Sequence, residues 1–302
     1  MRVAVTGATG RIGTRLVDAL NARGDEVTVL SRRPDEARAK LGVEAHGWRP
    51  ESEPAPAAAL AGCDGVIHLA GEDPGRRWTA AVKRRLLESR EQGTRNLVAG
   101  LRAAEPRPGV LVSASAVGYY GARGDEPVTE DTGAGDDFLA RVCATWEREA
   151  VAAEQLGMRV VRVRTGVVLD RGGGALAKML PFFRLGVGGP VAGGRQYMPW
   201  IHVDDVVGIY LAALDGDGWS GAVNATAPAP VTNREFSHAL GRALRRPAIA
   251  PVPELALRVL YGEMADIVVY GQRAVPERAQ ALGYGFTHPE LDEALRSALS
   301  HT

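Results

Sequence analysis

The stretch SASAVGYYG, residues 113–121, places two serines and two tyrosines directly after the apolar run GVLV. Hydroxyl groups can donate a proton to a reacting oxygen, and a phenol with its ordinary pKa of about 10 stays protonated at neutral pH. The apolar run predicts a strand, and strands of a parallel sheet end at the ligand crevice. Ser113, Tyr119 and Tyr120 are therefore candidate proton-transfer residues. The alternative for both tyrosines is a non-catalytic wall of a substrate pocket.

A second stretch, TGATGRIG at residues 6–13, carries Gly7, Gly10 and Gly13 between an apolar strand pattern and a helical pattern. Glycine allows a tight turn and lets the backbone approach a pyrophosphate closely. The amino terminus of the following helix supplies N–H groups and a favourable dipole for an anion. This context predicts a dinucleotide site, whereas three glycines alone could be a structural turn.

The choice of dinucleotide is expected at the end of the second strand pattern, about 20 residues further on. An acidic residue there would bind a ribose 2′-hydroxyl, but this chain has VTVLSRRP, with Ser31, Arg32 and Arg33. A hydroxyl and guanidinium groups match a 2′-phosphate through charge-assisted hydrogen bonds. The sequence therefore favours NADP over NAD, the alternative being solvated arginines at a strand end.

Short apolar runs alternate with longer amphipathic runs through the first half of the chain. This alternation predicts an α/β fold with a doubly wound parallel sheet. We expect the NADP-binding Rossmann domain to span residues 1–166, with 201–227 returning to it. Glycine clusters interrupt the alternation after residue 166, and helical patterns dominate after residue 228. Residues 167–200 and 228–302 are accordingly expected to form a smaller, mostly helical substrate lobe over the carboxyl ends of the strands.

Composition limits the kinds of partner. The 302 residues carry 36 basic and 36 acidic side chains, a formal net charge of zero. Nucleic acids and anionic membranes favour basic surfaces, so a small-molecule substrate is expected instead, with neither nucleic acid nor membrane as a partner. Cys63 and Cys143 have no spacing typical of a metal site, and no apolar run is long enough to span a bilayer. These features predict a cytoplasmic protein without a bound metal.

The spacing Gly-x-x-Gly-x-x-Gly resembles that of the short-chain dehydrogenase/reductase superfamily. DGVIHLAG, RTGVVLDRGGG and PWIHVDDV are similar to landmarks of its extended branch. SAVGYYG and GEMADIVVYGQRAVPERAQALGYGF further resemble the NAD(P)-binding epimerase-family proteins, often labelled sugar-nucleotide epimerases, which carry a C-terminal domain of unknown function. The resemblance covers nearly the whole chain, although a shared fold does not establish an activity.

The resemblance also implies positions for the cofactor. The residues implied are Thr9, Gly10, Arg11 and Ile12 at the phosphates, Ser31 and Arg32 at the 2′-phosphate, Leu69 and Ala70 at the ribose, Arg85 and Arg90 on the helix after the fourth strand, and Val168 near the nicotinamide. Arg85 and Arg90 are five residues apart and do not share one helix face cleanly. Arg90, in SREQGT, is the preferred candidate of the two.

One feature of the superfamily is missing. A Tyr-x-x-x-Lys pair normally transfers the proton, the lysine holding the nicotinamide ribose and lowering the phenol pKa. In DFLARVCATWE the two places fall on Leu139 and Cys143, which cannot do this. The chain's three lysines, Lys40, Lys83 and Lys178, lie outside that helix. The tyrosines of SASAVGYYG could be displaced proton donors.

Other candidates line the expected substrate pocket. Gln196 and His202 flank YMPW, and Trp200 could either contact substrate or pack in a core. His68 is interpreted as a buried strand histidine, and the acidic segment 123–137 as a solvated connection. Two functions remain open: an NADP-dependent oxidoreductase or epimerase-like enzyme on a small, possibly sugar-derived molecule, and an NADP-binding sensor or partner-binding protein that has lost catalysis.

Overall fold

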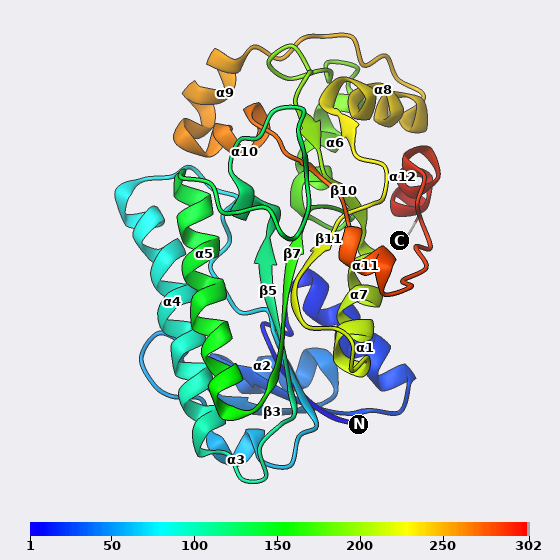
Figure 1. The fold of residues 1–302 in the computed structure, drawn as a ribbon. Helices are drawn as coiled ribbons and strands as arrows, with labels where there is room; N and C mark the ends of the chain where they lie inside the picture. Colours follow the sequence, from blue (N-terminus) through cyan, green and yellow to red (C-terminus); the bar gives the residue numbers. More distant parts are fainter. Residues whose placement is uncertain (301–302) are drawn as a thin grey trace.

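A parallel sheet of seven strands forms the centre of the computed structural model, which describes residues 1–300 (Figure 1). The strand order is β11-β7-β5-β4-β1-β2-β3, and every neighbouring pair runs parallel. The strands are β1 (Arg2–Thr6), β2 (Glu26–Ser31), β3 (Glu44–Gly47), β4 (Gly65–His68), β5 (Val110–Ala116), β7 (Arg159–Thr165) and β11 (Gly221–Ala225). This confirms the expected doubly wound α/β fold. The edge strand β3 was not foreseen, because EAHG carries no apolar alternation.

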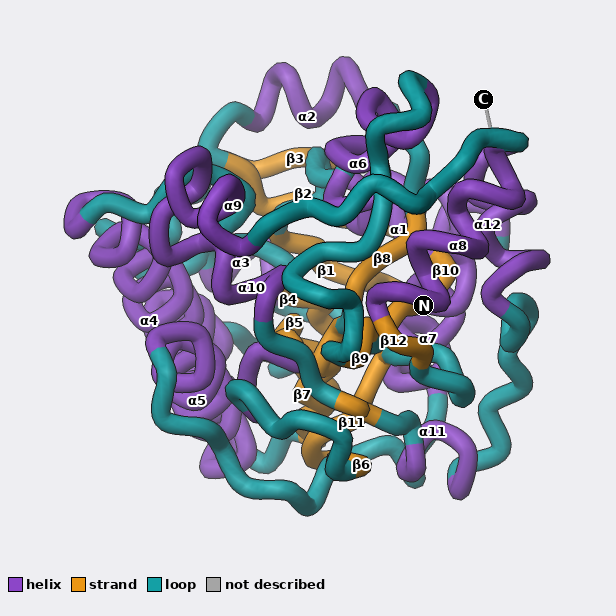
Figure 2. Tube along the Cα trace, turned by 90° about the horizontal axis from the view of Figure 1, so that it is seen from above, coloured by secondary structure: helices purple, strands orange, loops and turns teal. Residues whose placement is uncertain are grey.

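Helices cover both faces of this sheet (Figure 2). They are α1 (Arg11–Ala22), α2 (Pro34–Leu41), α3 (Ala57–Leu60), α4 (Ala80–Ala103), α5 (Phe138–Val151) and α7 (Val203–Asp215), with the 3₁₀ turns η1 (Val117–Tyr120) and η2 (Ala152–Leu156). Helix α1 buries Gly13, Leu16, Val17 and Leu20, the spacing of one helix face. One apolar core lies between the sheet and α1 and α7, and a second lies on the face covered by α3 and α4.

The remaining elements form a lobe above the carboxyl ends of β5 and β7, toward which the arrows of Figure 1 point. They are β8 (Val167–Leu169), α6 (Gly174–Arg184), β9 (Tyr197–Met198), β10 (Trp200–His202), β12 (Val231–Thr232), α8 (Asn233–Leu244), α9 (Glu254–Tyr261), η3 (Gly262–Ala265), α10 (Asp266–Val269) and α12 (Leu291–Ser300). A separate apolar core joins α6, α8 and α12. No helix within residues 1–300 is long and apolar enough to cross a membrane.

The last part of the chain does not stay within the expected lobe. Strand β13 (Arg273–Ala274) pairs with β6 (Pro127–Val128), and helix α11 (Glu277–Ala281) packs against β11. Tyr284 and Phe286 then pack against the core beneath α7. The segment 273–286 therefore belongs with the dinucleotide-binding part by its contacts, and the expected boundary at residue 228 is too simple.

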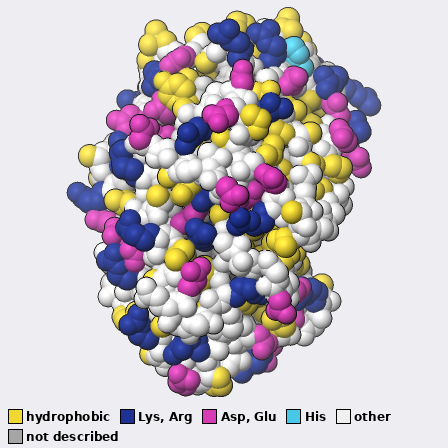
Figure 3. All heavy atoms as spheres, viewed as in Figure 1, with side chains coloured by type: hydrophobic (Ala, Val, Ile, Leu, Met, Phe, Trp, Pro, Cys, Tyr) yellow, Lys and Arg dark blue, Asp and Glu magenta, His cyan; other side chains and the backbone are white. Residues whose placement is uncertain are grey.

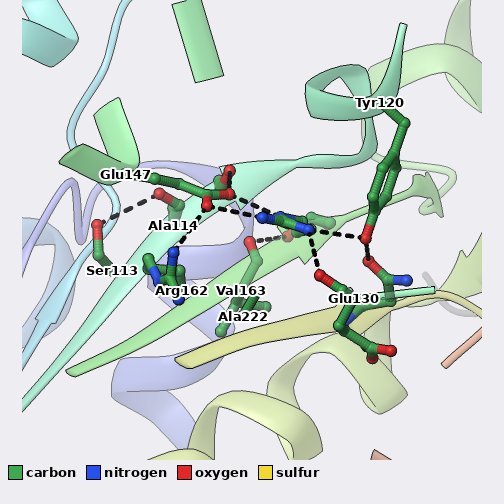
Figure 4. Close-up of polar contacts among 12 residues, drawn as sticks. Ser113, Ala114, Tyr120, Glu130, Glu147, Arg162, Val163 and Ala222 are labelled. Carbon is green, nitrogen blue, oxygen red and sulfur yellow. Dashed lines mark hydrogen bonds and ion pairs between the residues drawn. The ribbon is translucent and has the colours of Figure 1, made fainter. Parts of the chain in front are cut away.

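A buried polar network joins α5 to the sheet (Figure 4). Glu147 of α5 and Arg164 of β7 are each only 3% exposed and form an ion pair at 2.8 Å. Glu147 also accepts hydrogen bonds from Ser115 at 2.7 Å and from Arg162 at 3.2 Å. Burial alone would lower the pKa of Arg164, but the hydrogen bonds from its guanidinium to Glu147 raise that pKa overall. The network therefore pairs the two buried charges with each other and with neighbouring polar groups.

The same network continues into the segment that was expected to be a solvated connection. Glu130 is buried, and its Oε1 accepts hydrogen bonds from the backbone N–H groups of Asn224, at 2.9 Å, and Arg278, at 3.3 Å. The Glu130 carbonyl accepts from Arg164 at 3.1 Å. The prediction was wrong for this residue, because Glu130 satisfies backbone donors of segments distant in sequence. Burial raises the pKa of the Glu130 carboxyl above its ordinary value.

We predict that Glu147→Ala lowers the free energy of unfolding by about 3–5 kcal/mol, because it leaves the buried Arg164 without its counter-charge. Urea denaturation followed by circular dichroism measures the change. The matched control is Glu88→Ala, which removes an exposed ion pair with Arg84 on α4 and should cost no more than about 1 kcal/mol. Equal effects of the two variants would contradict the prediction.

Candidate cofactor and active site

The glycine turn between β1 and α1 is packed too tightly for side chains. A Cβ on Gly7, whose φ is +69°, would lie 2.7 Å from the Leu69 carbonyl carbon, and a Cβ on Gly13 would lie 2.5 Å from the Gly7 oxygen. No side chain caps the first turn of α1, which begins at Arg11. The amino terminus of α1 is thus left to an outside anion, in keeping with the phosphate contacts expected of Thr9 to Ile12.

The end of β2 presents the expected cation. Ser31 is the last residue of β2, and its Oγ accepts a hydrogen bond from the Arg33 N–H at 3.1 Å. Arg33 pairs with Glu36 at 3.0 Å, whereas Arg32 is exposed and makes no hydrogen bond or ion pair with any residue in 1–300. Of the two neighbouring guanidinium groups, that of Arg32 is the one available to an added anion.

The segment after β4 closes the other side of the turn. The Leu69 N–H donates to the Thr6 carbonyl at 3.1 Å, and the Ala70 N–H donates to Thr6 Oγ1 at 3.3 Å. His68 is fully buried and bridges Thr6 and Thr94, at 2.7 and 3.0 Å, which confirms its interpretation as a strand histidine. Burial lowers the pKa of His68 to about 3, so its ring stays neutral and serves as a structural link.

The two arginines of α4 differ clearly. Arg85 is exposed and lies 3.8 Å from Glu72. Arg90 is half-buried, with its guanidinium 4.8 Å from the Trp146 ring, and it donates to the Leu86 carbonyl at 3.1 Å. Burial lowers the pKa of Arg90, and no carboxylate in the described chain forms an ion pair with it. A Cβ on Gly71 would be only 3.3 Å from this guanidinium, so Arg90 borders the segment that follows β4.

Ser113 does not occupy the strand end at which it was expected. Strand β5 continues to Ala116, and Ser113 is fully buried between His68 of β4 and Arg162 of β7. Its Oγ donates to the neighbouring Ala114 carbonyl at 3.3 Å (Figure 4). The small residues that follow Ser113 extend the strand by three positions. Ser113 is therefore placed inside the sheet and away from the ligand crevice.

Tyr120, too, is not available as a proton donor. Its ring is fully buried, its hydroxyl donates to Asn224 Oδ1 at 2.6 Å, and it accepts from Arg164 at 3.0 Å (Figure 4). Burial raises the pKa of Tyr120 to about 12. The Tyr120 hydroxyl therefore donates one hydrogen bond and accepts another, and both hold η1 on the sheet. This phenol has a structural role.

Tyr119 is the tyrosine that remains available. It is half-buried, and its ring lies over the Arg164 guanidinium, whose central carbon is 3.6 Å from the ring centroid. The Tyr119 hydroxyl makes no hydrogen bond to a residue of the described chain. The neighbouring Gly118 packs on α5, where an added Cβ would lie 3.3 Å from Leu139 and 3.8 Å from the Cys143 sulfur. Tyr119 thus adjoins the helix face that carries a Tyr-x-x-x-Lys pair in the superfamily.

The environment of Cys143 makes its thiol unreactive. The side chain is buried, and burial raises the pKa of its thiol to about 12, despite the opposing charge of Arg90. The Arg90 guanidinium of α4 lies 4.8 Å from the Trp146 ring of α5, the same helix that carries Cys143. This contact between α4 and α5 could not be predicted from the sequence, since Arg90 and Trp146 are far apart along the chain.

Two lysines reach the candidate site from other elements. Lys40 of α2 donates to the Thr9 carbonyl of the glycine turn at 2.8 Å. Lys178 of α6 donates to the Gly75 carbonyl in the segment between β4 and α4. The scarcity of lysine in this chain was the only sequence signal that could have drawn attention to them. Lys83 instead pairs with Glu263 at the base of the lobe.

Two of the residues expected to line the substrate pocket, Trp200 and His202, are instead buried in the protein core. Trp200 is fully buried in the lobe core, with its indole N–H donating to the Ala229 carbonyl at 3.2 Å. His202 is fully buried at the N-cap of α7, where Nδ1 accepts from the Asp204 N–H at 3.2 Å. Neither reaches a solvent-facing cleft, so both depart from the expected role. Gln196 and Val168 are half-buried, and the Gln196 amide donates to the Val268 carbonyl at 2.9 Å.

Comparison with known proteins agrees with this architecture. The sequence pattern of the NAD dependent epimerase/dehydratase family matches residues 3–224, and a domain of unknown function, DUF1731, matches residues 252–298. The chain belongs to this epimerase family. Its members here include the human epimerase family protein SDR39U1, 39% identical over 99% of this chain and 100% of the human one. An Arabidopsis thaliana homologue, named as chloroplastic, is 41% identical over 99% of this chain and 87% of the plant protein.

Solved structures of epimerase-family proteins are also similar. The human SDR39U1 structure, determined with NADPH, superposes with a TM-score of 0.88 at 38% identity and covers all of both chains. A structure named as a nucleoside-diphosphate sugar epimerase from Corynebacterium glutamicum has a TM-score of 0.79 at 33% identity, covering 99% of this chain and 58% of that one. The epimerase fold and family are therefore shown. The cytoplasmic location remains a prediction, as one relative is named chloroplastic.

We predict that neither cysteine reacts with a thiol reagent such as DTNB in the folded protein at pH 8. Cys63 and Cys143 are buried, and burial raises both thiol pKa values. Both should react after denaturation in urea. The control is Ser52→Cys at an exposed position, which should react rapidly in the folded protein. Rapid modification of Cys143 in the native protein would overturn its assignment as an inert residue.

Proposed function

We propose that this epimerase-family protein binds NADP(H) and is an oxidoreductase or epimerase-like enzyme acting on a small, sugar-derived molecule. The observation that carries the cofactor assignment is the exposed Arg32 guanidinium, which directly follows β2 and has no partner in residues 1–300. A cation at this place suits a 2′-phosphate. The human relative whose structure was determined with NADPH supports the same choice.

The glycine turn and its neighbours fit the rest of the cofactor. The uncapped amino terminus of α1 suits the pyrophosphate, and Lys40 adds a cation at the same turn through its contact with Thr9. Arg90 borders Gly71 and contacts the Trp146 ring of α5, the helix that carries the superfamily lysine. We assign Arg90 the part of that lysine's role that needs only a fixed cation and hydrogen-bond donors, namely holding a ribose hydroxyl. Its guanidinium cannot shuttle a proton.

For the chemical step we assign proton transfer to Tyr119. NADPH held at this site would supply a hydride to a carbonyl carbon in a reduction and would become NADP⁺. The Tyr119 hydroxyl then donates its proton to the carbonyl oxygen, giving an alcohol and a phenolate that recovers a proton from water. The Arg164 guanidinium under the ring stabilises the negative charge that develops on the phenol.

The substrate class follows from a similar solved structure and from the contact between the lobe and the segment after β4. The Corynebacterium glutamicum structure, 33% identical to this chain, is named as a nucleoside-diphosphate sugar epimerase. Lys178 and Gly75 join α6 to the segment after β4 and so link the lobe to the cofactor side. A polar, sugar-derived ligand between these parts suits the hydrogen-bonding groups present.

A second function is favoured by one specific observation. Leu139 and Cys143 stand where the superfamily carries its proton-transfer pair, and Cys143 is inert. An NADP-binding sensor or partner-binding protein without catalysis would have the same cofactor site. Incubation of the NADPH-loaded protein with fractionated cell metabolites separates the two: oxidation of NADPH supports the enzyme, and binding without any turnover supports the sensor.

We predict that NADPH binds at least tenfold more tightly than NADH, a difference of about 1.4 kcal/mol or more. Arg32→Glu should erase or reverse this preference, because a carboxylate repels the 2′-phosphate and can bind a ribose hydroxyl. Isothermal titration calorimetry measures both affinities. Arg33→Glu is the matched control, since Arg33 is already paired with Glu36, and should change the preference less. Equal affinities of the parent protein for both cofactors would contradict the assignment of NADP(H) as the preferred cofactor.

We predict that Tyr119→Phe lowers the rate of reduction by about a hundredfold or more, the usual scale for a general acid, while NADPH affinity hardly changes. The rate is measured as substrate-dependent NADPH oxidation with an active metabolite fraction. Tyr120→Phe is the matched control: it should lower the melting temperature through loss of two buried hydrogen bonds, yet affect turnover less than Tyr119→Phe. Full turnover in Tyr119→Phe would show that Tyr119 only lines the substrate pocket and does not transfer a proton.

A further inference from the structure

Two histidines and a carboxylate converge where the C-terminal segment meets α7. His202 is the N-cap of α7, Asp204 lies in the first turn, and His288 comes from the segment before α12. Asp204 Oδ2 is 3.4 Å from His202 Nδ1 and 3.5 Å from His288 Nε2, and the two imidazole centroids are 3.9 Å apart. One ligand atom from each residue lies within 4.8 Å of the others.

The two nitrogen–oxygen separations, 3.4 and 3.5 Å, match the edges of a tetrahedral zinc site. Zinc binds histidine nitrogen at about 2.0–2.1 Å and carboxylate oxygen at about 2.0–2.2 Å, so ligand atoms around one ion are about 3.3–3.5 Å apart. Imidazole and carboxylate are also the ligand types that zinc accepts in sites with three protein ligands and an open fourth position. The ion would replace the 3.2 Å hydrogen bond from the Asp204 N–H to His202 Nδ1.

The surrounding residues fix this arrangement before any ion binds. Asp205 is buried and accepts hydrogen bonds from the backbone N–H groups of Thr287, at 2.7 Å, and His288, at 3.0 Å. The segment that carries His288 is therefore latched to the start of α7. Arg15 of α1 lies 3.9 Å from Asp204 Oδ1, the oxygen that does not face the histidines. Outer partners of this kind orient metal ligands.

Charge and access also suit a cation. The amino-terminal dipole of α7 and Arg15 oppose a positive ion, but Asp204 and Asp205 in the first turn of α7 and Asp170 beside Arg15 carry three negative charges. A hollow of about 250 Å³, lined by Arg15, Asp18, Ala19, Asp204 and Val207, opens onto Asp204. Water or an entering ion can thus reach the carboxylate from outside.

We propose that His202, Asp204 and His288 bind one zinc ion, which fastens the C-terminal segment to the amino terminus of α7. His202 and His288 are 86 residues apart in the sequence, so the ion cross-links the C-terminal segment to the dinucleotide-binding part. This site is separate from the proposed cofactor and proton-transfer residues. It does not rest on the proposed function.

Zinc titration of the full chain, free of any affinity tag, tests the proposal by isothermal calorimetry. We expect one equivalent of zinc per chain and a rise in melting temperature on binding. Cobalt(II) in place of zinc should give the visible absorption of a tetrahedral site. Asp204→Asn and His288→Gln should each weaken zinc binding at least tenfold and remove the cobalt spectrum, because each deletes one ligand while keeping similar side-chain size.

His46→Gln is the matched control, since His46 also faces a carboxylate, Glu44, at 3.0 Å but has no third ligand among residues 1–300. Its zinc affinity should equal that of the parent protein. Circular dichroism shows whether each variant folds, and His288→Gln, at a partly exposed position, keeps the test decisive if Asp204→Asn does not fold. Absence of stoichiometric zinc binding, or binding unchanged in both ligand variants, would overturn the proposal, as would an equal loss in His46→Gln.

Discussion

The ion pair between Glu147 and Arg164 positions the elements that meet at the carboxyl end of β5, namely α5, η1 and the segment that carries Glu130. Both side chains are 3% exposed, and neither charge could be buried without the other. Through Glu147 the pair ties α5 to Ser115 of β5, and through Arg164 it reaches Tyr120 and the Glu130 carbonyl. The position of η1, and hence of Tyr119, follows from these contacts.

The same pair explains why two adjacent tyrosines have different environments. The Tyr120 hydroxyl is drawn into the network, where burial raises its pKa to about 12. The Tyr119 ring instead stacks on the Arg164 guanidinium, and its hydroxyl makes no hydrogen bond within the described residues 1–300. A buried arginine can thus serve both as a structural partner and as a source of positive potential for a phenol.

The surface shows no large patch of a single charge on the face drawn in Figure 3. Basic and acidic side chains are mixed over the face shown in Figure 3, as the zero formal net charge would suggest. The proposed recognition therefore depends on local groups, such as the exposed Arg32 beside β2 and the carboxylates around Arg15. Isolated charges act over short distances in salt solution, so their placement within the fold matters more than the total.

The sequence by itself determined the sheet, the glycine turn and the cation at the end of β2. These features are local: apolar periodicity, glycines that alone fit the turn, and residues next to one another in the chain. The absence of the Tyr-x-x-x-Lys pair could be predicted in the same way. Tertiary structure alone decided that Ser113 lies inside β5, that Trp200 and His202 are buried, and that Glu130 is not solvated.

Only the fold brings Arg90 to the Trp146 ring, Lys40 to Thr9, and His288 to Asp204. Each contact joins segments that no periodicity or spacing relates, since it depends on how helices cross the sheet and on where the C-terminal segment returns. Burial then sets the chemistry, because the same side chain is reactive in water and inert in an apolar site. The sequence supplies the groups, while packing determines which of them remain available.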